Sequence, residues 1–373
     1  MKVTFKKITT TFVIFLFLAC IFISCNANKA TAQETKTLAQ NNLSEVQENP
    51  TNEKKMQVVF ELNKDLPQNH GVNAEKLQNF VDSIKNTEIT SNIIVKDGVI
   101  ISEYFKEGYD NTSVFSVQSC SKSITSAITG IAIAQGYIPD VNAPMTNYID
   151  VSSYKNKEQL EKITLRQLLT NTSGLTSTDT AIWNDWRMSD NWVDYLFTKP
   201  ILHKAGAVFE YSTGNTHLIS AMIQKATGKT LYEYGKAELF SKVGMNSVIC
   251  SSDAQGISDG GNGFSLTSYD MAKFGLLYLN KGVFNGEQII PKEWIEESTK
   301  IQLPNVANYG YQWWIRWFGS KAFKSYFAHG WGEQVIAVIP SANMVVVFTS
   351  RYANNNKNKI YWQYITDIVN AGN

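Results

Sequence analysis

The pattern of apolar and polar positions divides the chain into a mixed N-terminal region, a helical middle and a C-terminal region of strands. Apolar residues recur at helical spacing over residues 72–85, which predicts a first helix there. The stretch NIIVKDGVIISEYF alternates around Lys96-Asp97-Gly98 and predicts a tight β-hairpin. A run of small and apolar residues then extends from Ser116 to Gly136 and predicts a second, largely buried helix.

The remainder of the pattern fixes the fold class. From about Pro139 to Pro304, helical patterns alternate with loops rich in Gly and Asn. Strand patterns return in YGYQWWIRW, EQVIAVIP and NMVVVFTSR, and a closing helix is expected from about Lys359. Strands at both ends with helices between them predict an α+β fold, in which distant segments complete one sheet and the helices form an inserted subdomain.

The N-terminus has the pattern of an export signal. Three lysines precede an apolar run from Phe12 to Ile23, which is too short for a membrane-spanning helix but suits the apolar region of a secretory signal. Because a small residue, Ser24, stands just before Cys25, residues 1–25 resemble a bacterial lipoprotein signal in which Cys25 is lipidated. Cys20 is a rival site, and simple cleavage followed by secretion is the alternative.

The mature chain is expected to begin with a tether. Residues 26–70 are rich in Asn, Gln, Thr, Lys and Glu and poor in aromatics, which predicts a flexible linker before a folded domain over residues 71–373. We expect an exported protein. It would be either periplasmic, free or anchored to the membrane only through its lipid, or secreted. Cys120 and Cys250 are too few for a disulfide framework and are expected to pack as small apolar residues.

Composition and charge narrow the class of partner. The 373 residues are 43% hydrophobic and 12% aromatic, which suffices for one large domain or two closely packed ones. The net charge is +1 with both signs interspersed, so nothing favours nucleic acid, and a small molecule or peptide is the expected partner. His70, His203 and His217 lack the spacing of metal ligands, and no phosphate-loop motif occurs, so no metal and no cofactor are expected.

The candidate chemistry centres on Ser119. Ser119-Cys120-Ser121-Lys122 matches S-x-x-K, which puts Ser119 and Lys122 on one face of the predicted helix. A serine hydroxyl is a weak nucleophile and needs a base in contact, and a neutral lysine amine can serve. Backbone N–H groups of the first helical turn could hold a developing oxyanion. A structural helix cap is the alternative role for Ser119.

Two other serines match nucleophile motifs. Ser152 and Lys155 repeat S-x-x-K, but in a polar connector with no apolar face behind it. Ser258 lies in G-x-S-x-G with His329 later in the chain, but the motif requires a strand before it and a helix after it, and loop patterns flank it here. Both are weaker candidates than Ser119.

Five blocks along the chain resemble the serine β-lactamase-related family. They are SCSKSITSAITGIAIAQG, ITLRQLLTNTSGL, FEYSTGNTHLISAMIQKATG, GGNGFSLTSYDMAKFGLLYLNKG and HGWGEQVIAVIPSANMVVVFTSR. The resemblance runs from about residue 75 to about 365. The family includes class C β-lactamases, D-alanyl-D-alanine carboxypeptidases, esterases and 6-aminohexanoate-dimer hydrolases. The resemblance implies a β-lactamase/transpeptidase-like fold, with an antiparallel sheet flanked by helices and an inserted helical subdomain.

The resemblance also implies roles for particular residues. Ser119 would be the nucleophile, Lys122 its base and Tyr211 a relay that returns the proton to the leaving group. Tyr211-Ser212-Thr213 stands where the family has Y-x-N, so Thr213 keeps a hydroxyl but loses the amide that holds a substrate carbonyl. Without the resemblance, Tyr211 would be interpreted as a buried aromatic that anchors the FEYSTG turn.

The third family motif, K-T-G, falls on His329-Gly330-Trp331-Gly332, before the strand EQVIAVIP. Histidine has an unperturbed pKa of about 6.5 and is only partly charged at neutral pH, so recognition of a substrate carboxylate by an ion pair is weakened. The backbone between Trp331 and Glu333 is expected to supply a second oxyanion N–H. Pocket walls are sought among five tryptophans: Trp183, Trp186, Trp313, Trp314 and Trp331.

The sequence thus predicts an exported serine hydrolase that cleaves an ester or amide through an acyl-enzyme on Ser119. Two alternatives stay open. One is a penicillin-interactive enzyme, either a β-lactamase or a D-alanyl-D-alanine carboxypeptidase. The other is a non-catalytic exported binding protein on the same scaffold, for which Ser119, Lys122 and Tyr211 would lie too far apart to hydrogen-bond.

Overall fold

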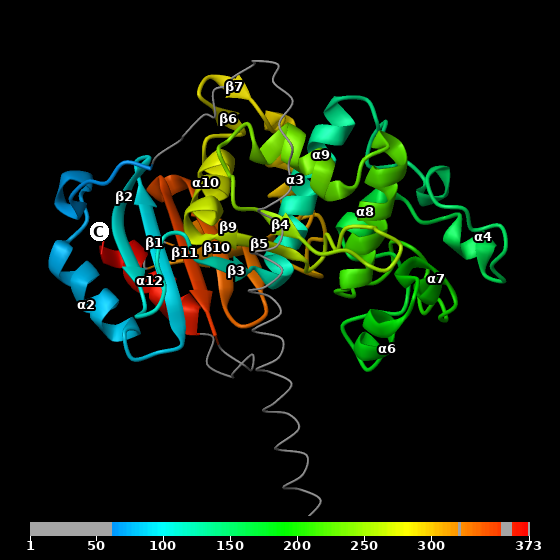
Figure 1. The fold of residues 1–373 in the computed structure, drawn as a ribbon, viewed down its shortest axis with the longest axis horizontal. Helices are drawn as coiled ribbons and strands as arrows, with labels where there is room; N and C mark the ends of the chain where they lie inside the picture. The colour runs from blue at the N-terminus through cyan, green and yellow to red at the C-terminus, as the bar shows by residue number, and fades with distance from the viewer. Residues whose placement is uncertain (1–61, 320–321, 352–359, 372–373) are drawn as a thin grey trace, which may run out of the picture. The chain divides into compact units, whose positions relative to one another are not determined.

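A computed structural model describes residues 62–319, 322–351 and 360–371. Its centre is a six-stranded antiparallel sheet with the order β2-β1-β11-β10-β9-β8 (Figure 1). Strands from the two ends of the sequence meet inside this sheet, because β1 pairs with β11. The α+β prediction is therefore confirmed. The strands are β1 (Ile89–Lys96), β2 (Val99–Phe105), β8 (Trp314–Phe318), β9 (Phe323–Gly330), β10 (Gln334–Ile339) and β11 (Met344–Ser350).

The predicted hairpin joins β1 to β2. Asp97 and Gly98 both adopt positive φ, at 51° and 85°, which is the conformation that a two-residue turn between right-twisted strands requires. Every residue of β1 except Lys96 is buried, so this strand is covered on both faces. Its consecutive residues Ile93 and Ile94 point to opposite faces and belong to two different hydrophobic clusters, one on each face of the sheet.

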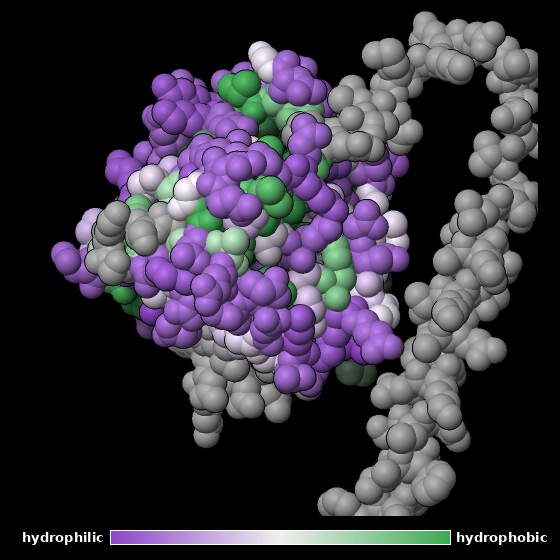
Figure 2. All heavy atoms as spheres, turned by 90° about the vertical axis from the view of Figure 1, so that its left-hand side faces the viewer, coloured by the Kyte–Doolittle hydropathy of each residue, from purple (hydrophilic) through white to green (hydrophobic). Residues whose placement is uncertain are grey.

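Two terminal helices cover one face of the sheet. α2 (Ala74–Ile84) and α12 (Ile360–Ala371) pack against each other and against that face, which confirms the first and last predicted helices. Phe80 of α2 meets Phe348 of β11 edge to face, with ring centroids 6.2 Å apart. The outward surface of this layer is largely hydrophilic, with scattered apolar patches (Figure 2).

The larger hydrophobic cluster lies on the other face and extends into the helical middle of the chain. α3 and α10 pack there against strands of the sheet, and α8 packs on α3 (Figure 1). The helices of this region are α3 (Ser121–Ala134), α4 (Lys157–Leu160), α5 (Leu165–Leu169), α6 (Trp183–Met188), α7 (Trp192–Phe197), α8 (Thr213–Thr227), α9 (Leu231–Gly235), α10 (Ser268–Leu279) and α11 (Lys292–Ser298).

Two small sheets were not predicted. One has the order β3-β5-β4 and the other pairs β6 with β7. Their strands are two to four residues long, too short for an alternating pattern to identify. They are β3 (Val114–Ser116), β4 (Ile249–Cys250), β5 (Phe264–Thr267), β6 (Val283–Phe284) and β7 (Glu287–Gln288). The first of them matters for the site, because β3 leads directly to Ser119.

Two predicted boundaries were wrong, and one strand was missed. The fold begins before Gly71, because Leu62 is buried in the core and residues 63–65 bond to the backbone of Ile100 along the outer edge of β2. The strand expected from Tyr309 begins only at Trp314, since Gln312 has a φ of 65° that no regular strand allows. β9 was missed, although its central residues are buried.

The proposed signal, the lipidation site Cys25 and most of the predicted linker lie outside the described residues. Within residues 62–319, 322–351 and 360–371, no helix is long and apolar enough to cross a membrane.

Candidate active site

Ser119 sits at the junction between the small sheet and α3. It belongs to a short 3-10 turn, Gln118–Cys120, that feeds directly into α3. Gln118 adopts a φ of 50°, a strained conformation for a residue other than glycine. β9 packs closely against this turn at Gly330, where an added Cβ would lie 2.3 Å from the Val117 carbonyl oxygen. The third predicted motif is thus packed against the backbone beside Ser119, and this contact requires glycine at position 330.

Lys122 is one helical turn after Ser119 and contacts it directly. Its ammonium is buried, and Nζ donates hydrogen bonds to Ser119 Oγ at 3.1 Å, Thr213 Oγ1 at 2.9 Å and the Gly261 carbonyl oxygen at 2.9 Å. Three acceptors therefore surround the three N–H bonds of a lysine ammonium. The predicted pairing of Ser119 with Lys122 is present in the structure.

Thr213 links Lys122 to a carboxylate that the sequence analysis did not identify. Thr213 Oγ1 donates to Asp179 Oδ1 at 3.0 Å, and its backbone N–H donates to Asp179 Oδ2. Because the threonine proton is committed to Asp179, its oxygen lone pair is turned toward Lys122. A neutral Lys122 amine that keeps its bonds to Thr213 and Gly261 would direct its own lone pair at Ser119.

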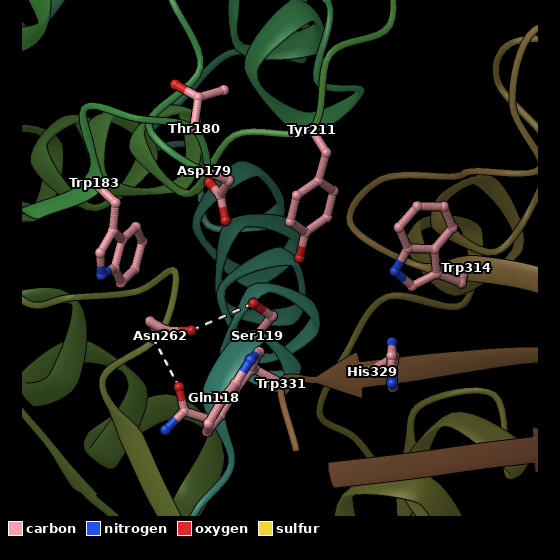
Figure 3. Close-up of a pocket in the computed structure, with 10 residues that line it drawn as sticks. All are labelled: Gln118, Ser119, Asp179, Thr180, Trp183, Tyr211, Asn262, Trp314, His329 and Trp331. Carbon is pink, nitrogen blue, oxygen red and sulfur yellow. Dashed lines mark hydrogen bonds between the residues drawn. The ribbon is translucent and has the colours of Figure 1, made fainter. Parts of the chain in front are cut away.

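A glycine-rich loop, Asp259–Gly263, supplies the other side of the site. Asn262 Oδ1 accepts a hydrogen bond from Ser119 Oγ at 3.3 Å, and Asn262 Nδ2 donates to Gln118 Oε1 at 2.9 Å (Figure 3). An added Cβ at Gly261 would lie 2.6 Å from Thr213 Cγ2, so the close approach of this loop depends on glycine. An amide does reach the site, from a loop far along the chain from Thr213.

An ion pair between Arg187 and Asp259 holds the Asp259–Gly263 loop in position. Arg187 Nη1 donates to Asp259 Oδ2 at 2.5 Å, and Asp259 Oδ1 accepts from the backbone N–H of Asn262 at 3.0 Å. The guanidinium also lies over the ring of Trp192, 4.1 Å from its centroid. Arg187 and Asp259 therefore act on the site through Asn262 and Gly261 and do not contact Ser119.

Tyr211 faces the same cavity as Ser119. Its ring stacks on Trp314 with centroids 5.7 Å apart and planes 22° apart, and Lys122 Nζ lies 4.8 Å from the ring centroid. Figure 3 shows its hydroxyl directed toward Ser119. Among the described residues, no hydrogen bond joins that hydroxyl to Ser119 or Lys122. Tyr211 is thus a half-buried pocket wall with its polar end in the cavity, and the turn-anchoring interpretation is incomplete.

His329 is placed differently from the expectation. It precedes β10, as expected, but it lies within the unpredicted strand β9, where it pairs with Val335 of β10. The chain then reverses through residues 331–333, in which Gly332 and Glu333 have φ of 77° and 66°. Trp331 is 48% exposed at this turn and faces the cavity with His329.

These residues enclose a cavity of about 600 Å³ (Figure 3). Three of the five candidate tryptophans line it, whereas Trp186 and Trp313 are fully buried in the core, so those two predictions were wrong. Among the described residues on the wall, Asp179 is the acidic one. The lining residues are Gln118, Ser119, Asp179, Thr180, Trp183, Tyr211, Asn262, Trp314, His329 and Trp331.

The rival serines have no comparable environment. Ser152 is exposed, in a turn after Asp150. Ser258 is buried between loop segments, and its hydroxyl accepts from the Tyr232 backbone N–H at 3.2 Å. It has neither the strand nor the helix that a G-x-S-x-G nucleophile requires.

The cysteine beside Ser119 has an apolar environment. Burial raises the pKa of the Cys120 thiol far above its ordinary value, so this thiol is not a competing nucleophile. In the part of the chain that the structure describes, no group of three or more His, Cys, Asp or Glu could hold a metal ion.

Sequence reasoning missed Asp179, Asn262 and the Arg187–Asp259 pair. The available signal was the glycine cluster in DGGNG, which marks a close backbone approach but does not say to which segment. Asp179 had no local signal, because its importance comes from Thr213, which is distant in sequence.

Comparisons with known proteins agree with this architecture. A family model described as Beta-lactamase matches residues 90–370. A 6-aminohexanoate-dimer hydrolase of Paenarthrobacter ureafaciens is 22% identical over 236 residues, which cover 60% of this chain and 60% of that protein. An uncharacterized protein of Alkalihalophilus pseudofirmus is 23% identical over 308 residues, 75% of this chain and 88% of the other. A solved structure from Bacillus anthracis, provisionally assigned as a 6-aminohexanoate-dimer hydrolase, superposes with a TM-score of 0.70 at 22% identity, covering 83% of this chain and 87% of that one.

Proposed function

The chain belongs to the beta-lactamase family, and we propose that it is a serine hydrolase that cleaves an ester or amide through an acyl-enzyme on Ser119. The observation that carries the proposal is the direct contact of Ser119 Oγ with the buried Lys122 Nζ at 3.1 Å. A non-catalytic binding protein has no need for a buried lysine beside a serine that opens into a cavity. This contact therefore supports an enzyme over the binding-protein alternative.

In the first step, the neutral Lys122 amine takes the proton of Ser119 Oγ while Oγ bonds to the substrate carbonyl carbon. The carbonyl π electrons move to oxygen, which becomes the oxyanion. We assign its stabilisation to backbone N–H groups at Ser119 and in the Trp331–Glu333 turn. Thr213 and the Gly261 carbonyl hold the amine in place during this transfer.

In the second step, the tetrahedral intermediate collapses and the bond to the leaving group breaks. The leaving group takes a proton from Lys122 through the Tyr211 hydroxyl, which leaves an ester on Ser119. Water then attacks that ester and gives a proton to the same pair, which passes it to Ser119 Oγ as the bond to the acyl carbon breaks, so that the acid and free Ser119 are released. The position of Lys122 Nζ, 4.8 Å from the centroid of the Tyr211 ring, supports this role.

Esterase or amidase activity is favoured over penicillin-interactive activity by the charge of the cavity wall. β-Lactams and D-alanyl peptides carry a carboxylate, whereas the described residues that line the cavity around Ser119 include Asp179 and neither lysine nor arginine. A carboxylate near Asp179 would be repelled.

The test is active-site labelling combined with turnover. Ser119→Ala is expected to abolish both hydrolysis of p-nitrophenyl esters and labelling by a fluorophosphonate, with Ser258→Ala as the matched control that keeps both. Mass spectrometry should locate the adduct on Ser119. Undiminished labelling and turnover in Ser119→Ala would refute the proposal. A fluorescent penicillin adduct on Ser119 would favour the penicillin-interactive alternative.

We also propose that the protein is exported and lipidated on Cys25. The support is the sequence pattern of residues 1–25 alone. Metabolic labelling with a radioactive fatty acid tests it. The label should disappear in Cys25→Ser and persist in Cys20→Ser, and the reverse result would move the modification to Cys20.

A further inference from the structure

A second cavity of about 480 Å³ adjoins the one around Ser119. The two share Gln118 and Trp331 as common walls, so these side chains form a ridge between them. The second cavity is lined by Tyr109, Val114, Phe115, Ser116, Gln118, Trp331, Gly332, Gln334, Ser350 and Arg351. A molecule bonded to Ser119 could extend across the ridge into this second space.

The two cavities carry opposite charges. Asp179 is the charged side chain lining the first, whereas Arg351 is the charged side chain lining the second. The proposed catalytic serine lies on the first side, next to the ridge residue Gln118. A substrate that bridges the cavities would therefore meet a positive charge at the end that lies beyond Trp331.

Arg351 is held in position by an aromatic ring, and no ion pair joins it to another described residue. Its guanidinium lies over the Tyr109 ring, 4.9 Å from the centroid, and that ring stacks on Phe115 with centroids 5.5 Å apart. Its backbone N–H donates to the Glu88 carbonyl at 2.9 Å. Among the described residues, no carboxylate lies within 4.0 Å of its guanidinium nitrogens. The aromatic face orients the guanidinium and leaves its N–H edge available for an anion.

A hydroxyl donor lies in the same cavity. Ser116 is exposed, and its oxygen accepts a hydrogen bond from Gln118 Nε2 at 2.8 Å, so its proton remains available to an acceptor. Arg351 and Ser116 thus offer charged and neutral donors between the aromatic walls of Phe115 and Trp331. Such a set suits a carboxylate on an apolar or aromatic chain.

We propose that this second cavity binds a carboxylate at the end of the substrate's acyl or leaving group. The inference rests on the proposed function, because the substrate must be attached at Ser119 while its far end reaches Arg351. Its charged group is distinct from the third motif, since Arg351 follows β11, which is separated from β9 by β10, whereas Trp331 and Gly332 of that motif contribute to the cavity wall. It makes the preferred substrate an ester or amide with one anionic end.

Two matched substrate pairs test the proposal. For the acyl side, the pair is p-nitrophenyl hydrogen adipate and its neutral methyl ester. For the leaving-group side, the pair is 4-acetoxybenzoate and its neutral methyl ester. In the wild type, the anionic member of one pair should have the higher kcat/KM. Arg351→Gln should lower the ratio of anionic to neutral kcat/KM for that pair by about tenfold, mainly through KM, because one charge-assisted contact is lost.

Two further variants sharpen the result. Arg351→Lys keeps the charge without the planar fork and should lose only part of the preference. Lys76→Gln removes a positive charge from exposed α2 and should leave the ratio unchanged. Added salt should reduce the wild-type preference, because the site is partly exposed.

The outcomes separate this inference from the proposed function. If a fluorophosphonate labels Ser119 but neither anionic member is preferred, or if Arg351→Gln leaves the ratio unchanged, the carboxylate site is refuted alone. If Ser119 is not labelled in the wild type, the proposed function fails and the substrate-binding inference fails with it.

Discussion

The ion pair between Arg187 and Asp259 should be essential for the reactivity of Ser119, although neither residue touches it. We consider Asp259→Asn, which keeps the shape of the side chain and removes its charge. The Asn262 backbone N–H can still bond to the remaining oxygen, whereas the new amide can turn an N–H toward Arg187. The change therefore removes the anchor of the loop without creating a cavity.

The expected magnitude follows from the burial of the two partners. The Asp259 side chain is 1% exposed and that of Arg187 is 31% exposed. Removing one partner of a fully buried ion pair lowers the free energy of unfolding by about 3–5 kcal/mol, because the other charge is left buried and unpaired. The Arg187 guanidinium can still reach water, so the loss should be smaller here. We expect a loss of about 1.5–3 kcal/mol in the free energy of unfolding, which is the range for one charge-assisted hydrogen bond.

The effect on activity should exceed the effect on stability. Gly261 and Asn262 contact Lys122 and Ser119 from the loop that Asp259 holds, and displacement of reacting groups by about 1 Å can lower the rate about 100-fold. The loss should appear in kcat for p-nitrophenyl acetate and in the rate of fluorophosphonate labelling, with little change in KM. Urea unfolding measures the stability of the same variants.

A double-mutant cycle separates the ion pair from the packing of Arg187. Arg187→Gln also loses the contact with Trp192, so it should destabilise more than Asp259→Asn. Combined, the two changes should cost less than the sum of the single changes, because the pair can be broken only once. If Asp259→Asn keeps its labelling rate within twofold and its unfolding free energy within about 0.5 kcal/mol of the wild type, the positioning role is wrong.

Three further predictions concern stability and reactivity. Gly130→Ala would put a Cβ 2.3 Å from Trp294 Cγ, so urea unfolding should show a loss of about 1–3 kcal/mol, and an unchanged midpoint would contradict this packing. The Cys120 thiol, whose pKa burial raises, should react with iodoacetamide only after unfolding, and rapid labelling of the native protein would contradict its burial. Burial alone would raise the pKa of Asp253, but its hydrogen bonds from His217 and backbone amides outweigh burial and lower it. The stability that Asp253 contributes is therefore present above pH about 4 and lost as pH falls through the lower folded-state pKa. The unfolding free energy of Asp253→Asn should depend less on acid pH than that of the wild type. If both proteins lose stability in parallel as pH falls, the prediction is refuted.

Much of the fold could be predicted from local sequence patterns. The hairpin, the first and last helices and the buried strands β10 and β11 were predicted because their side chains repeat with the period of one regular element. β9 was missed, and β3 to β7 were too short to identify. β3, for example, is stabilised by its pairing with β5, which is distant in sequence, and not by its own periodicity.

The candidate site divides in the same way. Ser119 and Lys122 could be predicted because one helical turn fixes their contact, whatever the rest of the chain does. Asp179, Asn262 and Arg351 gained their positions only from tertiary structure. Asn262 meets Ser119 across 143 positions of sequence, and Asp179 meets Thr213 across 34. Local spacing determines which groups share an element, whereas the packing of loops and strands determines which charges and amides surround the nucleophile, and hence the substrate it would accept.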